Sequence, residues 1–351
     1  MQLTANQHPT DIKPGKRIEY IDAMRGFTMI LVVFYHVGLY CWDTPLRVES
    51  LHKYCLQVRM PLFFFISGFV LYKASVVWNL QQVVKFFRKK IPVQLLAPLV
   101  FFLIFIHVKD YPLMESIEHV HKKGYWFTFV LLEYYVFYAG IRFLIRNEKV
   151  SSIVLILLGL ILYFMNWDYV PIPSNIKGIL SVGNWHRFLF FVLGTLVKKN
   201  FSTVERLLDT KWLLACCIVY YFVVNGFSDL IPTEHFASAL QLTLTLTGLT
   251  ILFSFFRNKQ DVFKKETALG NCLQYIGRRT LDVYLIHFFL LPENLNFVTV
   301  FIDHPMPIIE ATVSLTIAMI IVAFCLLIGN IIRLSPVLAH WVFGAKYPTQ
   351  K

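Results

Sequence analysis

Long apolar runs restrict this chain to a small set of folds. A helix needs about 20 mostly apolar residues to cross the hydrocarbon core of a bilayer, and ten stretches of the sequence approach that length. We therefore predict an all-α fold, a polytopic membrane bundle of about ten transmembrane helices. The expected spans are residues 24–42, 58–78, 90–108, 125–146, 150–167, 185–198, 211–227, 236–256, 274–292 and 308–332.

The composition supports a lipid environment. Of the 351 residues, 57% are apolar and only 15% are charged, whereas about a quarter of the residues in a typical soluble domain are charged. Such a chain has too little polar surface to cover itself in water. We expect a multi-pass protein of the cell (inner, cytoplasmic) membrane, with the bilayer as its partner.

The positions of the basic residues predict the orientation. With the N-terminus in the cytoplasm, 25 of the 33 Lys and Arg lie on the inner side and 8 on the outer side, as the positive-inside rule requires. This favours an even number of spans and two cytoplasmic termini. In this orientation most of the basic residues face the anionic lipid of the inner leaflet. The net charge of +12 therefore indicates contact with lipid rather than with nucleic acid.

The predicted organisation is a cytoplasmic arm over residues 1–17, a transmembrane domain over 18–335 and a cytoplasmic tail over 336–351. The first apolar run follows a basic arm and precedes no small-residue cleavage site, so we expect a retained span. None of the six cysteines has metal-ligand spacing. Cys41 and Cys55 bracket the first outer loop, where they form either a disulfide or, as we favour, two buried thiols.

Ionisable groups within the first span are the strongest functional candidates, because such groups are costly in a bilayer. Eleven residues separate Arg25 from His36, which at ~100° per residue is about three turns, so both lie on one helix face. Asp22, three residues before Arg25, is placed to pair with it and to cap the helix. The alternatives are a basic anchor for Arg25 and a packed core histidine for His36.

Three further places carry charge. Arg88, Lys89 and Lys90 open the third span and are suited to phosphate binding or to simple anchoring. In the ninth span, Asp282 and His287 are about 140° apart on a helix and do not share a face. In the fourth span, Glu133 is neutralised by Arg187 of the sixth if the two spans are neighbours. The outer loop 166–185 is rich in aromatic residues, either to stack on sugars or to form an interfacial belt.

Six phrases in order now resemble integral-membrane acyltransferase family 3. They are YIDAMRGFTMILVVFYH, MPLFFFISGFVLY, FFRKKIPVQLLAPLV, YWFTFVLLEYYVFY, RFLFFVLGTLV and IGRRTLDVYLIHFFL, and they cover residues 18 to 335. The family's first span carries Asp-x-x-Arg-Gly followed by His eleven residues after the Arg, a spacing that is intact here.

The resemblance implies an O-acyltransferase that moves an acyl group, usually acetyl, from cytoplasmic acyl-CoA to a hydroxyl of a glycan or lipid-linked sugar. It implies His36 as general base, Arg25 at the donor, and a donor site at Arg88, Lys89 and Lys90. From the matching phrases we also expect Trp126 and Tyr284 to contact substrate, together with Asp22 and Arg187. His287, Glu133 or Arg187 then orients His36 or stabilises the oxyanion.

Two departures concern the donor site: Lys90 stands where the family has Arg, and Gln94 replaces a basic residue often found there. We expect no permanently bound cofactor or metal, only acyl-CoA as donor substrate. The sequence does not decide between a monomer and a homodimer. The rival functions are a proton-coupled transporter or exporter and a non-catalytic subunit of a glycan-assembly complex. Carriers often show inverted repeats, and we find none in the sequence.

Overall fold

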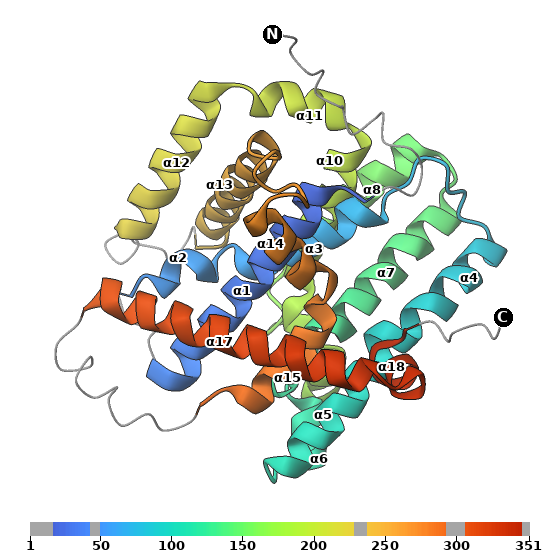
Figure 1. The fold of residues 1–351 in the computed structure, drawn as a ribbon. Coiled ribbons are helices and arrows are strands. Elements are labelled where there is room, and N and C mark those ends of the chain that lie inside the picture. Colours follow the sequence, from blue (N-terminus) through green and yellow to red (C-terminus); the bar gives the residue numbers. More distant parts are fainter. Residues whose placement is uncertain (1–16, 43–49, 228–236, 293–305, 346–351) are drawn as a thin grey trace.

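The computed structural model describes residues 17–42, 50–227, 237–292 and 306–345, which form helices and no strand (Figure 1). The first half contains α1 (Glu19–Trp42), α2 (His52–Leu56), α3 (Arg59–Leu71), α4 (Leu80–Ile91), η2 (Pro92–Leu96), α5 (Ala97–Val108), α6 (Leu113–Glu118), η3 (Lys122–Gly124), α7 (Trp126–Leu144) and α8 (Glu148–Phe164). The second half contains α9 (Ser174–Ile179), η4 (Val182–Arg187), α10 (Phe188–Lys199), α11 (Phe201–Leu208), α12 (Lys211–Gly226), α13 (Ala237–Asn258), α14 (Ala268–Arg278), α15 (Thr280–Leu290), α17 (Pro307–Arg333) and α18 (Pro336–Phe343).

The all-α membrane fold is confirmed, whereas the count of ten spans and the sides of the termini stay predictions. A helix lies in each of the ten expected ranges. Within the described residues, six helical segments are long and apolar enough to cross a bilayer, and a seventh is added if the bent pair α11 and α12 forms one span. The other expected spans fall on helices that are too short for a simple crossing.

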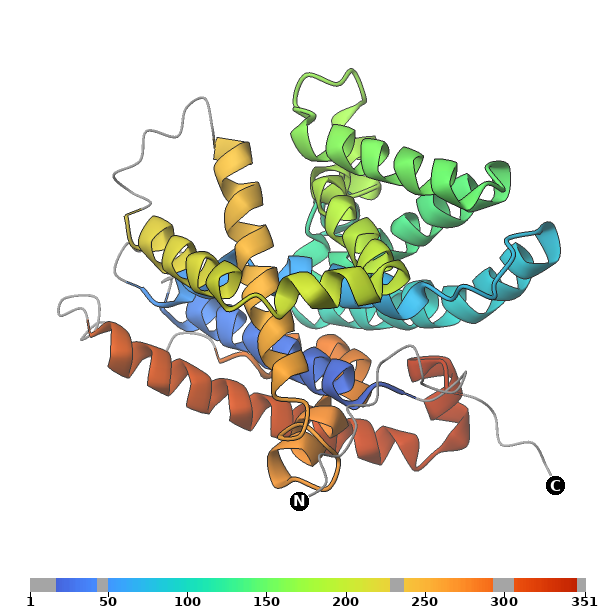
Figure 2. The same ribbon diagram turned by 90° about the horizontal axis from the view of Figure 1, so that it is seen from above.

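Helix α1 lies at the centre of the bundle, packed against α3, α13, α14, α15 and α17 (Figures 1 and 2). Its closest neighbour is α14, and two glycines permit the approach. A Cβ on Gly26 would lie 2.0 Å from the carbonyl oxygen of Leu273, and one on Gly277 would lie 1.9 Å from that of Asp22. The Gly that follows Arg25 therefore lets two backbones touch, which fixes the height of Arg25 against α14.

A second glycine pair joins α3 to α10. A Cβ on Gly68 would lie 1.9 Å from the Phe191 carbonyl oxygen, and one on Gly194 would lie 2.0 Å from that of Phe65. The buried rings of Phe64, Phe69 and Phe191 fill the space beside these contacts. The second and sixth predicted spans are thereby held together as one rigid unit.

The third predicted span is continuous and contains a π-helical turn. Residues Leu80–Val108 pass from α4 through the π-helical turn η2 into α5. Pro92 and Pro98 stand in the first turns of η2 and α5, where a missing N–H disrupts regular α-helical bonding. A π-helical turn changes the direction in which side chains point and is frequent at functional sites.

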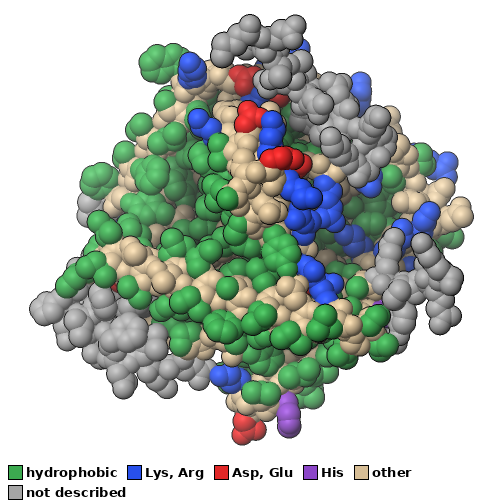
Figure 3. All heavy atoms as spheres, viewed as in Figure 1, with side chains coloured by type: hydrophobic (Ala, Val, Ile, Leu, Met, Phe, Trp, Pro, Cys, Tyr) green, Lys and Arg blue, Asp and Glu red, His purple; other side chains and the backbone are tan. Residues whose placement is uncertain are grey.

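The surface agrees with a lipid environment. Hydrophobic side chains cover much of the face shown in Figure 3, whereas Lys and Arg gather mainly in its upper part. Helix α17 exposes a series of large apolar side chains, among them Ile308, Leu315, Ile320, Phe324 and Ile331. An apolar area this long is unfavourable in water and suited to acyl chains.

The six cysteines are free thiols. Cys41 is buried and Cys55 is half-buried, so the thiol alternative describes the structure better than the disulfide. The loop between them, residues 43–49, and most of the predicted arm, residues 1–16, lie outside the described residues. The predicted tail contains α18, and a Cβ on Gly344 after it would lie 2.5 Å from Val93 of η2. This segment therefore packs onto the bundle.

Candidate active site

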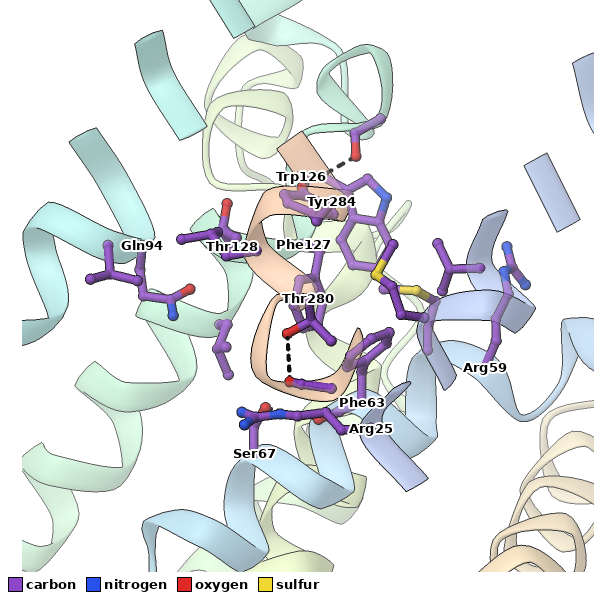
Figure 4. Close-up of a pocket in the computed structure, with 18 of the residues that line it drawn as sticks. Arg25, Arg59, Phe63, Ser67, Gln94, Trp126, Phe127, Thr128, Thr280 and Tyr284 are labelled. Carbon is purple, nitrogen blue, oxygen red and sulfur yellow. Dashed lines mark hydrogen bonds between the residues drawn. The ribbon is translucent and has the colours of Figure 1, made fainter. Parts of the chain in front are cut away.

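A cavity of about 270 Å³ lies among α1, α3, α4, η2, α7, α14 and α15. Arg25 and His36 both line it, which confirms that they share one face of α1. In Figure 4, Arg25 and Ser67 lie together at one end, Thr280 and Tyr284 lie further along, and Trp126 lies at the other end. The cavity thus follows α1 from Arg25 towards His36.

His36 is paired with His287. His36 Nδ1 lies 3.0 Å from His287 Nε2, and the ring of His287 is fully buried. The Nδ1 of His287 lies 3.0 Å from the carbonyl oxygen of Val283 and 2.9 Å from that of Tyr284. The ninth predicted span therefore supplies a direct partner to the first.

The hydrogen bonds define the tautomers of both rings. A carbonyl oxygen only accepts, so Nδ1 of His287 carries a hydrogen and, in the neutral ring, its Nε2 accepts. His36 Nδ1–H must then donate to His287 Nε2. The Nε2 of His36 is left with a lone pair, which is the requirement for a general base.

Basic side chains from three helices line the cavity. Arg25, Lys90 and Arg278 line it, coming from three different helices. Lys90 Nζ donates to Tyr135 Oη at 3.3 Å, and Arg278 Nη1 donates to Gln274 Oε1 at 3.2 Å. Three converging cations suit the phosphates of an anionic ligand.

The helix points the three basic residues predicted to bind the donor, Arg88, Lys89 and Lys90, in different directions. Lys90 lines the cavity, whereas Arg88 and Lys89 are exposed and do not. Gln94, four residues after Lys90, also lines the cavity, and its Oε1 is buried without a hydrogen-bond partner. Residues four apart share a helix face, so the cavity side of this segment is Lys90 and Gln94 rather than the triplet.

Asp22 does not pair with Arg25 as expected. It lies in the first turn of α1, which begins earlier, at Glu19, and its Oδ2 is 3.8 Å from Arg17 Nη1. Among the described residues, Arg25 has no ion-pair partner. Arg25 acts on Asp22 only as a nearby charge, and it lines the cavity.

Comparison with known proteins identifies the chain. The family model described as an acyltransferase domain, acyltransferase family 3, matches residues 18–328. The chain belongs to acyltransferase family 3. No curated protein and no solved structure matches it. The protein is thus a membrane acyltransferase, and the resemblance read from its six phrases is confirmed.

A constrained loop presents Trp126 to the cavity of this acyltransferase. Lys122 and Lys123 have positive φ angles, and a Cβ on Gly124 would lie 2.1 Å from the Phe288 ring. Lys122 Nζ donates to Ser181 Oγ at 2.8 Å, and burial lowers the pKa of this ammonium to about 8. Tyr284 Oη donates to the Gly124 carbonyl oxygen at 3.3 Å. These contacts fix the start of α7.

Glu133 and Arg187 are near each other in the fold but not paired, so the expected neutralisation is wrong. Glu133 Oε2 accepts from Trp185 Nε1 at 2.6 Å, and Arg187 Nη1 donates to Asn184 Oδ1 at 2.6 Å. The fourth and sixth predicted spans are nevertheless neighbours, because Tyr134 of α7 packs on Phe188 and Phe191 of α10. Neither Glu133 nor Arg187 lines the cavity, although Arg187 lies 5.3 Å from the Trp126 ring centroid.

Asp282 has a separate role from His287, as their angular spacing predicted. Its carboxylate accepts from Arg333 at 2.6 and 2.8 Å and from Arg279 at 3.3 Å. This ion cluster ties α15 to α17. It orients the helix that carries His287 without touching that ring.

Sequence reasoning missed two cavity arginines of the acyltransferase, Arg59 and Arg278. Arg59 stands immediately before the apolar phrase of the second span, and Arg278 lies in the Gly-Arg-Arg of the last phrase, where both look like anchors. In the sequence, the sign of their role is that Arg59 adjoins one of the six phrases and Arg278 lies within another. Among the described residues, no group of three or more His, Cys, Asp or Glu is placed to hold a metal ion.

Proposed function

We propose that this membrane acyltransferase moves an acetyl group from acyl-CoA to a hydroxyl of a glycan or lipid-linked sugar, with His36 as general base. The observation that carries the proposal is the His36–His287 pair, which leaves a lone pair on His36 Nε2 within a cavity lined by cations. A neutral imidazole with a free ring nitrogen takes a proton from a hydroxyl as the oxygen attacks, which is the role of a general base.

The donor binds with its phosphates at Arg25, Lys90 and Arg278, which line the cavity. Gln94 accepts a hydrogen bond from the donor's amide-bearing arm, since its buried Oε1 has no partner in the protein. Positive-inside reasoning places this site at the cytoplasm, where acyl-CoA is found. The thioester then points along α1 towards His36.

The reaction is a direct transfer. His36 Nε2 takes the proton of the acceptor hydroxyl as its oxygen attacks the thioester carbonyl carbon, and the carbonyl π electrons move to oxygen. Collapse of this tetrahedral intermediate breaks the C–S bond, and the CoA thiolate takes the proton back from the imidazolium. His287 keeps His36 in the productive tautomer throughout, which makes it a positioning residue.

Labelled acetyl-CoA tests this proposal. The purified protein in nanodiscs is incubated with labelled donor and a membrane glycolipid extract, and both thioester consumption and label in the glycolipid are measured. His36→Ala should reduce transfer by about 10²–10⁴-fold, whereas His107→Ala, at an exposed histidine of α5, should not. Equal transfer by His36→Ala and wild type would rule out His36 as the base.

A further inference from the structure

A second region of positive charge lies away from Arg25 and consists of Arg59, which lines the cavity, and Arg187, which lies just outside it. Arg59 lines the cavity, with its guanidinium carbon 3.4 Å from the ring centroid of Tyr35, the residue before His36. Arg187 stacks near the Trp126 ring, which also lines the cavity. Figure 4 shows Arg59 and Trp126 on a different side of the cavity from the guanidinium of Arg25.

These two arginines have no acidic partner among the described residues. Arg59 Nη1 donates to the Leu56 carbonyl oxygen at 3.1 Å, and its Nε is buried without a hydrogen-bond partner. Arg187 bonds the neutral amide of Asn184, and the nearby carboxylate of Glu133 is bonded to Trp185. Each guanidinium is within electrostatic range of the other, so they repel.

An uncompensated pair of half-buried cations is unfavourable unless an anion completes it. The guanidinium fork matches a carboxylate or a phosphate through two parallel hydrogen bonds. His121, whose ring centroid is 6.0 Å from that of Trp126, does not add charge at neutral pH. Burial of its ring and the neighbouring Arg187 lower the pKa of this histidine to about 4.

The donor does not account for this second group. The phosphates of acyl-CoA lie in one part of the molecule, and the proposed function already assigns them to Arg25, Lys90 and Arg278, which also line the cavity. The second cationic group is close to His36, where the acceptor hydroxyl must come. The anion that these guanidinium groups need must therefore come from the acceptor.

We propose that the acceptor carries an anionic group, a sugar carboxylate or a phosphate, which Arg59 binds beside His36, with Arg187 next to the Trp126 ring adding positive charge nearby. This inference rests on the proposed function, because it assigns the second end of the cavity to the acceptor. Arg59 contacts the anion directly and Trp126 forms the adjoining wall, whereas Arg187 lies beside the Trp126 ring without lining the cavity. Neutral sugars lack the partner that these guanidinium groups need, so they bind more weakly.

A binding experiment in saturating CoA tests the inference separately from catalysis. CoA occupies the donor end, and the protein in nanodiscs is titrated with glucuronate, glucose 1-phosphate or methyl glucoside while tryptophan fluorescence is recorded. We expect one or both anions to bind at least about tenfold more tightly than methyl glucoside. A preference between glucuronate and glucose 1-phosphate identifies the carboxylate or the phosphate as the natural group.

Variants identify the binding residues. Arg59→Gln and Arg187→Gln should each remove most of the preference for anions, and Arg59→Lys should keep part of it because the charge remains but the fork is lost. Arg146→Gln, at an exposed arginine after α7, is the matched control and should bind as wild type does. Because Arg59 also packs on Tyr35, circular dichroism on each variant checks folding, and Arg187→Gln provides an independent test.

The outcomes separate this inference from the proposed function. Equal binding of methyl glucoside and the two anions, or undiminished anion binding in both glutamine variants, overturns the anionic acceptor site even if acetyl transfer is observed. Selective anion binding that depends on Arg59 supports it even where the His36→Ala experiment refutes the base assignment.

Discussion

Removing the acceptor nitrogen of His287 should slow transfer without weakening donor binding. In His287→Leu, the Nδ1–H of His36 loses its partner at 3.0 Å, and a buried donor without a partner costs about 1–3 kcal/mol. The ring can avoid this cost by moving its hydrogen to Nε2, which removes the base. At 1.36 kcal/mol per tenfold change, the rate should fall by about 5–150-fold.

The assay is single-turnover transfer of labelled acetyl-CoA, with kcat and the donor KM determined separately. We expect kcat to fall and the donor KM to stay unchanged, because the Arg25 end of the cavity is not altered. His287→Gln should recover part of the rate, since an amide oxygen can accept the same hydrogen bond. A His287→Leu enzyme with the wild-type kcat, or a Gln variant no better than Leu, would refute the tautomer argument.

Three further predictions concern the donor, the helix contact and a loop histidine. Arg278→Gln should raise the acyl-CoA KM about tenfold by removing a charged phosphate contact, whereas exposed Arg88→Gln should not; equal KM values would contradict the revised donor site. Gly26→Val should cost several kcal/mol through its clash with α14 and lower the yield of folded protein in size-exclusion chromatography, while Gly140→Ala, with open space around it, should not. The pKa of His121 in the folded protein is lowered to about 4. Between about pH 4 and 6.5 the unfolded chain therefore binds a proton that the folded protein does not, so stability should rise with pH in this range. Thermal unfolding of His121→Gln should show a smaller rise of stability with pH, and the same rise as in wild type would contradict this prediction.

Helical periodicity was sufficient for the features that lie within one span. It correctly put Arg25 and His36 on one face of α1, and it separated Asp282 from His287. These relations depend only on the angle per residue, which is nearly constant in any α-helix. The fold class follows from the apolar runs for a similar reason, because few structures satisfy backbone hydrogen bonds in lipid.

Relations between spans were not predictable in this way. The expected ion pairs of Asp22 with Arg25 and of Glu133 with Arg187 were both wrong, since the actual partners come from Arg17 and from the aromatic loop. The partner of His36 was proposed only as one of three residues. Which helices meet is decided by contacts such as that between Gly26 and α14, where a missing side chain carries no obvious signal in a single sequence.

The donor site shows how the two kinds of information combine. A run of three basic residues cannot place all its charges in one cavity, because consecutive residues on a helix point about 100° apart. The structure selects Lys90 from the run, and the same face continues to Gln94. The acyltransferase thus has an amide where its family often has a cation, and Arg278 from α14 also lines the cavity. The cavity wall therefore takes positive charge from α14 as well as from α4.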